Sequence, residues 1–304
     1  MQDNNKEKID VSIAIPVFNE RAAVRKCIID LKSKMDTLPY KYEIIIVDDG
    51  STDGSMDEIK DLPVTIIKNT YNRGGGVCRV IGMQHARGDI ILQTDADGTY
   101  PVDNIDKILE ELKTADIVIG SRTKETQKKF YLLRIFMKWF IRKIAEFLVK
   151  QKIPDLNSGL RAYRKDIAMK YIYLYPAGHS IMSTMTIAFI LEGFRVKFVP
   201  IEYQPRIGRT SFNIVKDTWS YLQVTLTTVV FFNPLRVLMP VALSIILMAI
   251  GFTIRDVMRL GLGPLTVLLW ILAVLIIILA IISEQIMRLS KYLAYFFHEK
   301  YSKK

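Results

Sequence analysis

Two aspartates, one residue apart, are the side chains whose types and spacing most directly suggest chemistry. Asp95 and Asp97 lie in the segment DIILQTDADGTYP (89–101), directly after an apolar run. Like charges at the end of a buried strand repel each other and lose hydration, so the arrangement favours a cation beside them. Carboxylate oxygens suit Mg²⁺ or Mn²⁺. An Asx-turn without a metal is the alternative on these residues alone.

Two further polar segments follow or precede regular patterns. IIIVDDGSTDGS places Asp48 and Asp49 after a second apolar run. A carboxylate there can accept hydrogen bonds from a nucleobase or a ribose, although Ser51 or Asp53 could also cap a helix starting near Met56. The glycines of NRGGG (72–76) let the backbone approach a ligand closely. This segment is neither GxGxxG nor a P-loop, which argues against dinucleotide binding and kinase-type chemistry.

Alternating strand and helix patterns supply the scaffold for these segments. Strands are predicted at 11–17, 43–49, 64–68, 89–95 and 116–121, and helices at 21–35, 77–86 and 102–113. This alternation indicates an α/β fold with a mostly parallel, Rossmann-like sheet covered by helices. Ligands of such sheets bind beyond the carboxyl ends of the strands. We expect that edge to gather Asn19, Glu20, Asp48, Asp49, Asp95, Asp97 and Arg122.

Charge and cysteine content indicate the surroundings in which the 304-residue chain works. The formal net charge is +11, and many basic residues lie inside apolar stretches. That pattern favours an anionic membrane surface over nucleic acid. The two cysteines form no CxxC pattern, which fits a reducing compartment. The N-terminal segment lacks the apolar run of a signal peptide, so we expect the first domain to be cytosolic.

The composition changes near Asn233, where two long apolar segments begin. We predict transmembrane helices over about 234–254 and 264–284, because each segment approaches the roughly 20 apolar residues that a bilayer crossing requires. Asn233 and Pro234 form an N-cap pattern, and Pro240 should kink or shorten the first helix. The basic tail predicts that both termini are cytoplasmic, in a multi-pass protein of the cell membrane.

Two further segments resemble helices that lie in the lipid interface. In 127–150, Arg134, Lys138 and Arg142 recur every four residues and share one helix face amid apolar side chains. A packed helix with snorkelling basic residues is the alternative. Residues 213–233 are predicted to form a second such helix.

The ordered set IPVFNE, VDDGSTDGS, NRGGG, TDADG and GSR resembles the nucleotide-sugar-binding domain of family 2 glycosyltransferases, which have the GT-A fold. DLNSGLRAYRK, YQPRIGRTSF and the two apolar segments resemble the polyprenyl-phosphate branch, typified by dolichol-phosphate mannose synthase. The resemblance covers nearly the whole chain. It implies a glycosyltransferase domain over 1–212 that includes the interfacial helix 127–150, then the helix 213–233, and a transmembrane hairpin with a basic tail over 234–304.

The resemblance also implies a donor site. A nucleotide sugar would be bound by Pro16, Val17, Phe18, Asn19, Glu20, Val47, Asp49, Ser51, Gly76, Asp95, Ala96, Asp97, Arg206 and Arg209. Asp95 and Asp97 would hold Mg²⁺ or Mn²⁺ on the donor diphosphate. Two positions depart from the family pattern. Thr99 replaces a glutamine that often serves as a further metal ligand, and Arg209 stands where lysine is frequent.

The implied acceptor is a polyprenyl phosphate, such as a dolichyl or undecaprenyl phosphate. Its phosphate would be bound by Arg122, Arg134, Lys138 and Ser211. Asp97, Asp155 and Arg122 are the predicted catalytic residues, although Asp155 could equally be a turn-forming aspartate. A phosphate oxygen is ionised near neutral pH and would attack the anomeric carbon without a strong general base.

Two other functions stay open from the sequence. One is a processive polysaccharide synthase, although none of the three tryptophans follows that group's Gln-x-x-Arg-Trp pattern. The other is a non-catalytic membrane scaffold with a transferase fold. The sequence leaves open the sugar, the choice between UDP and GDP, the lipid length and a homo-oligomeric state.

Overall fold

The computed structural model describes residues 8–122, 139, 142–143, 145–147, 149–176, 181–205, 223, 227–259 and 261–302. The chain forms two compact units, one of Met1–Glu146 with Gln151–Thr225 and one of Phe147–Lys150 with Leu226–Lys304. Most of the two predicted interfacial helices lies outside the described residues. So do five predicted site residues: Arg134, Lys138, Arg206, Arg209 and Ser211.

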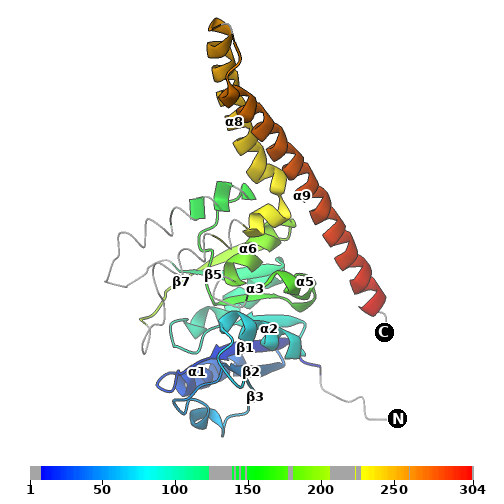
Figure 1. The fold of residues 1–304 in the computed structure, drawn as a ribbon. Helices are drawn as coiled ribbons and strands as arrows, with labels where there is room; N and C mark the ends of the chain where they lie inside the picture. Colours follow the sequence, from blue (N-terminus) through cyan, green and yellow to red (C-terminus); the bar gives the residue numbers. More distant parts are fainter. Residues whose placement is uncertain are drawn as a thin grey trace. The chain divides into compact units, whose positions relative to one another are not determined.

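The described part of the first unit contains a seven-stranded sheet in the order β3-β2-β1-β4-β6-β5-β7 (Figure 1). Its β6 is antiparallel to β4 and β5, and the other neighbouring strands are parallel. The mostly parallel sheet of the sequence prediction is therefore confirmed. The strands are β1 Val11–Val17, β2 Tyr42–Asp48, β3 Thr65–Lys68, β4 Ile90–Gln93, β5 Ile117–Arg122, β6 Arg161–Arg164 and β7 Val196–Ile201.

Helices cover both faces of this sheet. The α-helices are α1 Val24–Asp36, α2 Gly75–His85, α3 Ile105–Leu112, α5 Lys165–Lys170 and α6 Ile181–Leu191, and the short 3₁₀ helices are η1 Asp57–Ile59, η2 Val102–Asn104 and η3 Ile172–Leu174. α1 and α3 pack on one face, where they share one apolar cluster with the strands. α2 lies on the other face, where a methyl group on Gly82 would come within 2.8 Å of the Ala14 Cβ. α6 covers that same face, because it contacts Arg161, which alternates along β6 with Ala162 of the cluster.

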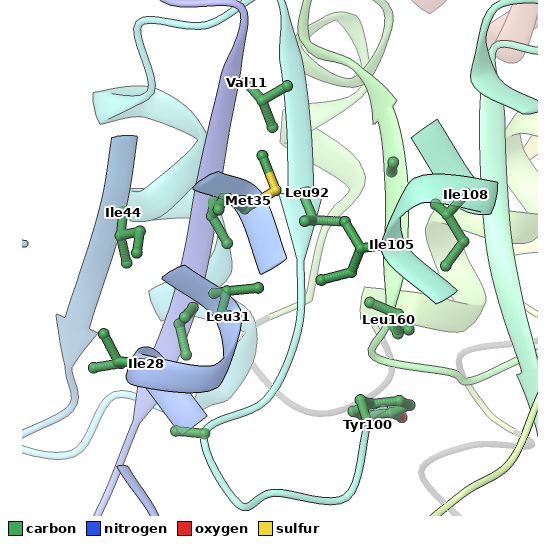
Figure 2. Packing of buried hydrophobic residues seen from close by; sticks show 14 of the residues in the cluster. Val11, Ile28, Leu31, Met35, Ile44, Leu92, Tyr100, Ile105, Ile108 and Leu160 are labelled. Atoms are coloured by element: carbon green, nitrogen blue, oxygen red, sulfur yellow. The ribbon is translucent and has the colours of Figure 1, made fainter. Parts of the chain in front are cut away.

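The cluster beneath α1 and α3 is the main core of this unit. Figure 2 shows Ile28 and Leu31 of α1 beside strand residues such as Ile44, while Ile105 of α3 lies near Leu92 and Leu160. The spacing of the buried α1 residues Val24, Ile28, Leu31 and Met35 is helical, so they form one stripe. This burial fixes the strands whose ends carry the polar segments.

Several element boundaries differ from the sequence prediction. α1 begins at Val24 rather than Arg21, because residues 21–23 form a turn. The Arg21 N–H of this turn donates a hydrogen bond to Asp53, in the loop after β2. β4 ends at Gln93, so Asp95 and Asp97 lie in the following loop and not at the strand end. The predicted helix from 102 divides into η2 and α3.

The second unit is a helical hairpin of α8 (Pro234–Met258) and α9 (Pro264–Ser302). The predicted cap is confirmed, because Asn233 Oδ1 accepts a hydrogen bond from the Arg236 N–H at 3.3 Å. Pro240 lies inside α8 and does not end it, so of the two predicted effects, a kink or a shorter helix, the shortening does not occur and the kink stays a prediction. Both helices are long and apolar enough to cross a membrane. In the most apolar 18-residue stretch of each, only 11% of the residues of α8 and 22% of those of α9 are buried.

Candidate active site

The loops after β1 and β2 are joined to each other by polar side chains. Asn19 has a left-handed backbone conformation (φ 54°), and its N–H donates to Ser51 Oγ at 3.0 Å. In return, the Thr52 N–H donates to Asn19 Oδ1 at 2.9 Å. Asn19 and Ser51 therefore hold the two loops in register beside Phe18, whose side chain is 43% exposed.

Three predicted donor-site residues lie within strands. Pro16 of β1 pairs with Val47 of β2, and Val17 is the last residue of β1. The side chains of Val17 and Val47 are buried in the unit. They can therefore meet a ligand only through backbone atoms, and their side chains serve the packing of the strands.

Asp49 shapes the glycine-rich turn that precedes α2. Its Oδ1 accepts hydrogen bonds from the Arg73 N–H at 2.8 Å and from Asn69 Nδ2 at 3.0 Å. Its Oδ2 accepts one from the Gly74 N–H at 2.9 Å. Gly74 has φ 96°, a conformation that favours glycine. The buried Asp49 thus fixes the turn that leads to Gly76, in the first turn of α2.

The Asp-x-Asp loop has two differently held carboxylates. Asp95 Oδ1 accepts a hydrogen bond from Nη2 of Arg79, a residue of α2. The two side chains form a largely buried ion pair. Asp97 Oδ1 accepts from the Thr99 N–H at 3.1 Å and from Thr99 Oγ1 at 2.6 Å. Ala96, between them, packs into the core cluster. Thr99, at the position of the expected third metal ligand, is fully buried and orients Asp97 instead.

A thiol lies against the same loop. Cys27 of α1 donates to the Asp95 carbonyl oxygen, with Sγ 3.5 Å away. Burial raises the pKa of Cys27 to about 12, with further contributions from the carboxylates of Asp97 and Asp95. The thiol therefore stays protonated at neutral pH and is a poor candidate for a nucleophile or a thiolate ligand.

The two carboxylates fit a divalent cation that is shared with a ligand. No group of three or more His, Cys, Asp or Glu side chains that could hold a metal occurs in the described ranges. Mg²⁺ commonly uses one or two carboxylates, keeps waters and binds substrate phosphates. Asp95 and Asp97 suit that incomplete type of site better than a closed protein cage.

Arg122 and Asp155 form a second charged pair. Arg122 Nε lies 2.6 Å from Asp155 Oδ2, and Arg122 Nη2 lies 2.9 Å from Asp155 Oδ1, which is the two-pronged geometry. Burial alone would raise the pKa of Asp155. The positive charge of Arg122 and the hydrogen bonds from Arg122 and Asn157 have the opposite and larger effect, so the pKa of Asp155 lies below its usual value. Asp155 is therefore ionised and holds the Arg122 guanidinium, which also lies 5.4 Å from the centre of the Tyr203 ring.

The turn 155–159 connects this pair with the Asp-x-Asp loop. The Gly159 N–H donates to the Tyr100 hydroxyl at 2.7 Å. A methyl group on Gly159 would lie 2.7 Å from Asp95 Oδ2, so the backbone of this turn closely approaches the carboxylate. The fully buried Arg161 anchors the same turn by donating from Nε to the Ser158 carbonyl oxygen at 3.1 Å.

The structure thus brings together Asp49, Asp95, Asp97, Asp155 and Arg122 around the sheet edge through named contacts. Sequence reasoning missed several residues of this network, among them Arg79, Gly159 and Arg161. A signal existed for Arg79, because it lies one turn beyond the glycines at the start of α2. Nothing in the sequence marks Arg161 as a buried residue.

Comparisons with known proteins identify the family of the chain. The model of glycosyl transferase family 2 matches residues 12–172, and that of the GtrB C-terminal hairpin matches residues 233–289. An undecaprenyl-phosphate 4-deoxy-4-formamido-L-arabinose transferase of Edwardsiella ictaluri is 25% identical over 84% of this chain and 78% of its own. A dolichol-phosphate mannosyltransferase of Pyrococcus furiosus is 32% identical over 58% of this chain and 52% of its own.

A further relative and a solved structure complete the comparison. The Aeromonas hydrophila transferase named for the same arabinose sugar is 30% identical over 54% of this chain, which spans about half (52%) of that relative's length. Glucosyl-3-phosphoglycerate synthase from Mycobacterium tuberculosis, solved with Mn²⁺, UDP and phosphoglyceric acid, gives a TM-score of 0.58 at 14% identity. That match covers 74% of this chain and 78% of the synthase and supports the GT-A fold alone. Because the family model covers more than half of the sequence, the chain belongs to glycosyl transferase family 2.

Proposed function

We propose that this protein transfers a sugar from a nucleotide sugar to a polyprenyl phosphate at a membrane and releases a nucleoside diphosphate. The observation that carries the proposal is the presence, in one chain, of a cluster of polar side chains and an apolar hairpin. The site lies at the carboxyl edge of the sheet, and the hairpin matches the GtrB C-terminal type. A water-soluble acceptor would leave the hairpin without a role in substrate binding.

The donor would bind at the loops after β1, β2 and β4. Phe18 offers an exposed ring to the base, and Asp49 fixes the glycine-rich turn against which the nucleotide would lie. Asp95 and Asp97 would hold a divalent cation, which would neutralise charge on the diphosphate. The related Mycobacterium fold binds Mn²⁺ and UDP, which supports Mg²⁺ or Mn²⁺ as the cation for this chain as well.

The acceptor phosphate would bind on the side of Arg122. One of its oxygens forms the new bond to the anomeric carbon while the bond from that carbon to the donor diphosphate breaks, so the configuration inverts. The electron pair of the broken bond leaves with the diphosphate. The phosphate arrives ionised, and Asp155 would therefore act by positioning Arg122 rather than by taking a proton.

Arg134, Lys138 and Ser211 remain predictions for the acceptor phosphate, as do Arg206 and Arg209 for the donor. The two interfacial helices and a homo-oligomer also remain predictions. Nothing in the proposal requires nucleic acid.

We also propose that the hairpin crosses the cell membrane with both chain termini in the cytoplasm. The basic residues near the C-terminus favour that orientation. Leu262, which is 65% exposed, lies between the two helices and would face the far side. A cysteine placed at Leu262 should react with an impermeant maleimide added to intact cells, whereas one placed at the exposed Lys60 should not. Reaction in the opposite pattern would refute this topology.

Nucleotide release by the purified full-length protein tests the proposed reaction. With Mg²⁺ and undecaprenyl phosphate, we expect one uridine or guanosine diphosphate sugar to yield its nucleoside diphosphate far faster than without the lipid. Screening UDP- and GDP-linked sugars against one lipid identifies the donor. Release that does not depend on lipid phosphate, with every donor, would contradict the proposal.

A further inference from the structure

Arg79 provides a fixed positive charge beside the Asp-x-Asp loop. It lies on α2, its side chain is 7% exposed, and its Nη2 donates to Asp95 Oδ1. Its Nη1 donates to the Gly75 carbonyl oxygen at 3.2 Å, while Nε has no hydrogen-bond partner within the described residues. The guanidinium is therefore held between the glycine-rich turn and one carboxylate.

The surroundings of Arg79 favour this pairing. A second arginine, Arg161, is fully buried nearby, and its guanidinium donates to neutral groups such as the Met182 carbonyl oxygen at 3.0 Å. Burial lowers the pKa of Arg161 to about 10, and the charge of Arg79 contributes in the same direction. Arg79 thus sits next to a like charge in the protein interior, so the Asp95 carboxylate offsets a repulsion that would otherwise destabilise both arginines.

Asp95 is constrained from the other side as well. A methyl group on Gly159 would meet Asp95 Oδ2 at 2.7 Å and the Asp95 Cγ at 3.1 Å. The carboxylate therefore lies between the Arg79 guanidinium and the backbone of the 155–159 turn. Its rotation is limited by both neighbours, so Oδ1 stays with Arg79 and Oδ2 stays on the side of the turn.

We propose that Arg79 is a positioning residue of the donor site: it acts as a permanent counter-ion that holds Asp95 and offsets its charge, so that a divalent cation binds strongly only together with a nucleoside diphosphate. This inference rests on the proposed function, because it concerns the cation that Asp95 and Asp97 would hold. With Arg79 in place, the three groups carry a net charge of about −1 rather than the −2 of two uncompensated carboxylates. The diphosphate would supply the missing negative charge.

Mn²⁺ binding to the full-length protein in detergent micelles tests this inference, since the electron paramagnetic resonance signal of free Mn²⁺ falls as the ion binds. Wild-type protein should bind Mn²⁺ weakly alone and about tenfold or more tightly with UDP or GDP. Arg79→Met, which removes the charge at similar length, should bind Mn²⁺ alone about tenfold more tightly than wild type. Arg79→Lys should stay close to wild type.

Arg164→Met is the matched control, because it removes an exposed arginine that pairs with Ile90 at the start of β4, at the far end of the strand from the Asp-x-Asp loop, and it should leave Mn²⁺ binding unchanged. Thermal unfolding in the same micelles shows whether each variant folds. If Arg79→Met does not fold, Arg79→Gln replaces it, since its amide can donate to Asp95 without a charge.

The outcomes separate the two proposals. If the wild type binds Mn²⁺ with nucleotide but the uncharged variants bind it no more tightly alone, the counter-ion role is wrong and the proposed function stands. Strong Mn²⁺ binding by the wild type without nucleotide also overturns the counter-ion role. If the wild type binds no Mn²⁺ even with UDP or GDP, the cation in the proposed function fails, and the role of Arg79 fails with it.

Discussion

The two units differ in where their large apolar side chains lie. In the α/β unit, the strand residues Ile13, Ile46 and Leu92 are fully buried. In the hairpin unit, Leu268 and Leu275 are 61% and 56% exposed, although they belong to an equally apolar run. Water penalises such a surface over two long helices, whereas lipid does not. The comparison teaches that the same residue types make a core in one unit and a membrane-facing surface in the other.

Polar groups follow the reverse pattern. In the α/β unit they gather at the sheet edge, where a ligand can reach Phe18 and Asp95. In the hairpin unit, the side chain of Asp256 is 4% exposed and closes the turn: its Oδ2 accepts from the Gly263 N–H at 2.7 Å and from Thr266 Oγ1 at 2.5 Å. By our proposal, polar groups serve ligand binding in the α/β unit, whereas the buried Asp256 holds the chain reversal in the hairpin unit.

The largest expected effect on sugar transfer comes from a substitution in the proposed donor site. Asp97→Asn should lower sugar transfer by at least about a hundredfold, because a lost metal ligand forfeits several kcal/mol of charge stabilisation. The asparagine oxygen can still accept from Thr99, so the circular dichroism spectrum should not change. Asp30→Asn, on the surface of α1, is the control and should retain full activity. Wild-type turnover by Asp97→Asn would remove Asp97 from the metal site.

The comparison becomes sharper when an aspartate replaces one exposed apolar residue in each unit. Leu275→Asp should disfavour membrane insertion of α9 by about 2.5–3.5 kcal/mol, the cost of an aspartate at mid-membrane. Ile29→Asp, at a 42% exposed position of α1, should change stability by less than about 0.5 kcal/mol. Leu275→Ala controls for size. The measurement is the fraction of protein left in membranes after an alkaline wash, and equal fractions for Leu275→Asp and Leu275→Ala would break the comparison.

Two glycines differ in the space around them: Gly159 of the α/β unit lies close to Asp95, whereas Gly251 of the hairpin unit has open space beside it. Gly159→Ala should destabilise the protein by about 1–3 kcal/mol and reduce transfer further, because the new methyl group displaces Asp95. Gly251→Ala, in α8, meets no atom within 4 Å and should be neutral or stabilising. Thermal unfolding and initial rates check both. A fully active Gly159→Ala would show that the position of Asp95 is not critical.

The smallest effect on the α/β unit is expected from a change at the hairpin turn. Asp256→Ala leaves the Gly263 N–H and the Thr266 hydroxyl without their acceptor, which should destabilise the turn by about 1–3 kcal/mol. Hydrogen exchange at Gly263 should accelerate by about tenfold or more. Nucleotide binding to the α/β unit should stay the same. Unchanged exchange at Gly263 would show that Asp256 does not hold the turn.

The sequence predicted the order of the first strands and helices because their apolar runs are regular and the polar segments punctuate them. It did not predict β6, α6 or β7, since the stretch from 151 to 201 has short elements and a buried helix without a polar face. Periodicity cannot identify such a helix. Likewise, α9 continues beyond the predicted end near residue 284, because helix formation does not stop where the apolar run ends.

The site was predicted by residue type more than by contact. The carboxylates Asp49, Asp95 and Asp97 were identified, but their partners were not, because hydrogen bonds to Arg79, Thr99 and the Gly74 N–H depend on tertiary packing. Asn19 and Ser51 were expected to face the ligand, yet they also join two loops. Pairwise contacts of this kind leave no period or spacing in the sequence.

The acceptor tests the central claim most directly. The purified protein is given one radiolabelled nucleotide sugar, Mg²⁺ and equal concentrations of undecaprenyl phosphate and 3-phosphoglycerate, and the products are separated between butanol and water. The pairing of a donor site with a lipid-facing hairpin predicts that label enters the butanol phase as a lipid-linked sugar that mild acid releases. Label that appears only in a glycosylated phosphoglycerate in water would contradict the account, because the hairpin would then serve no acceptor.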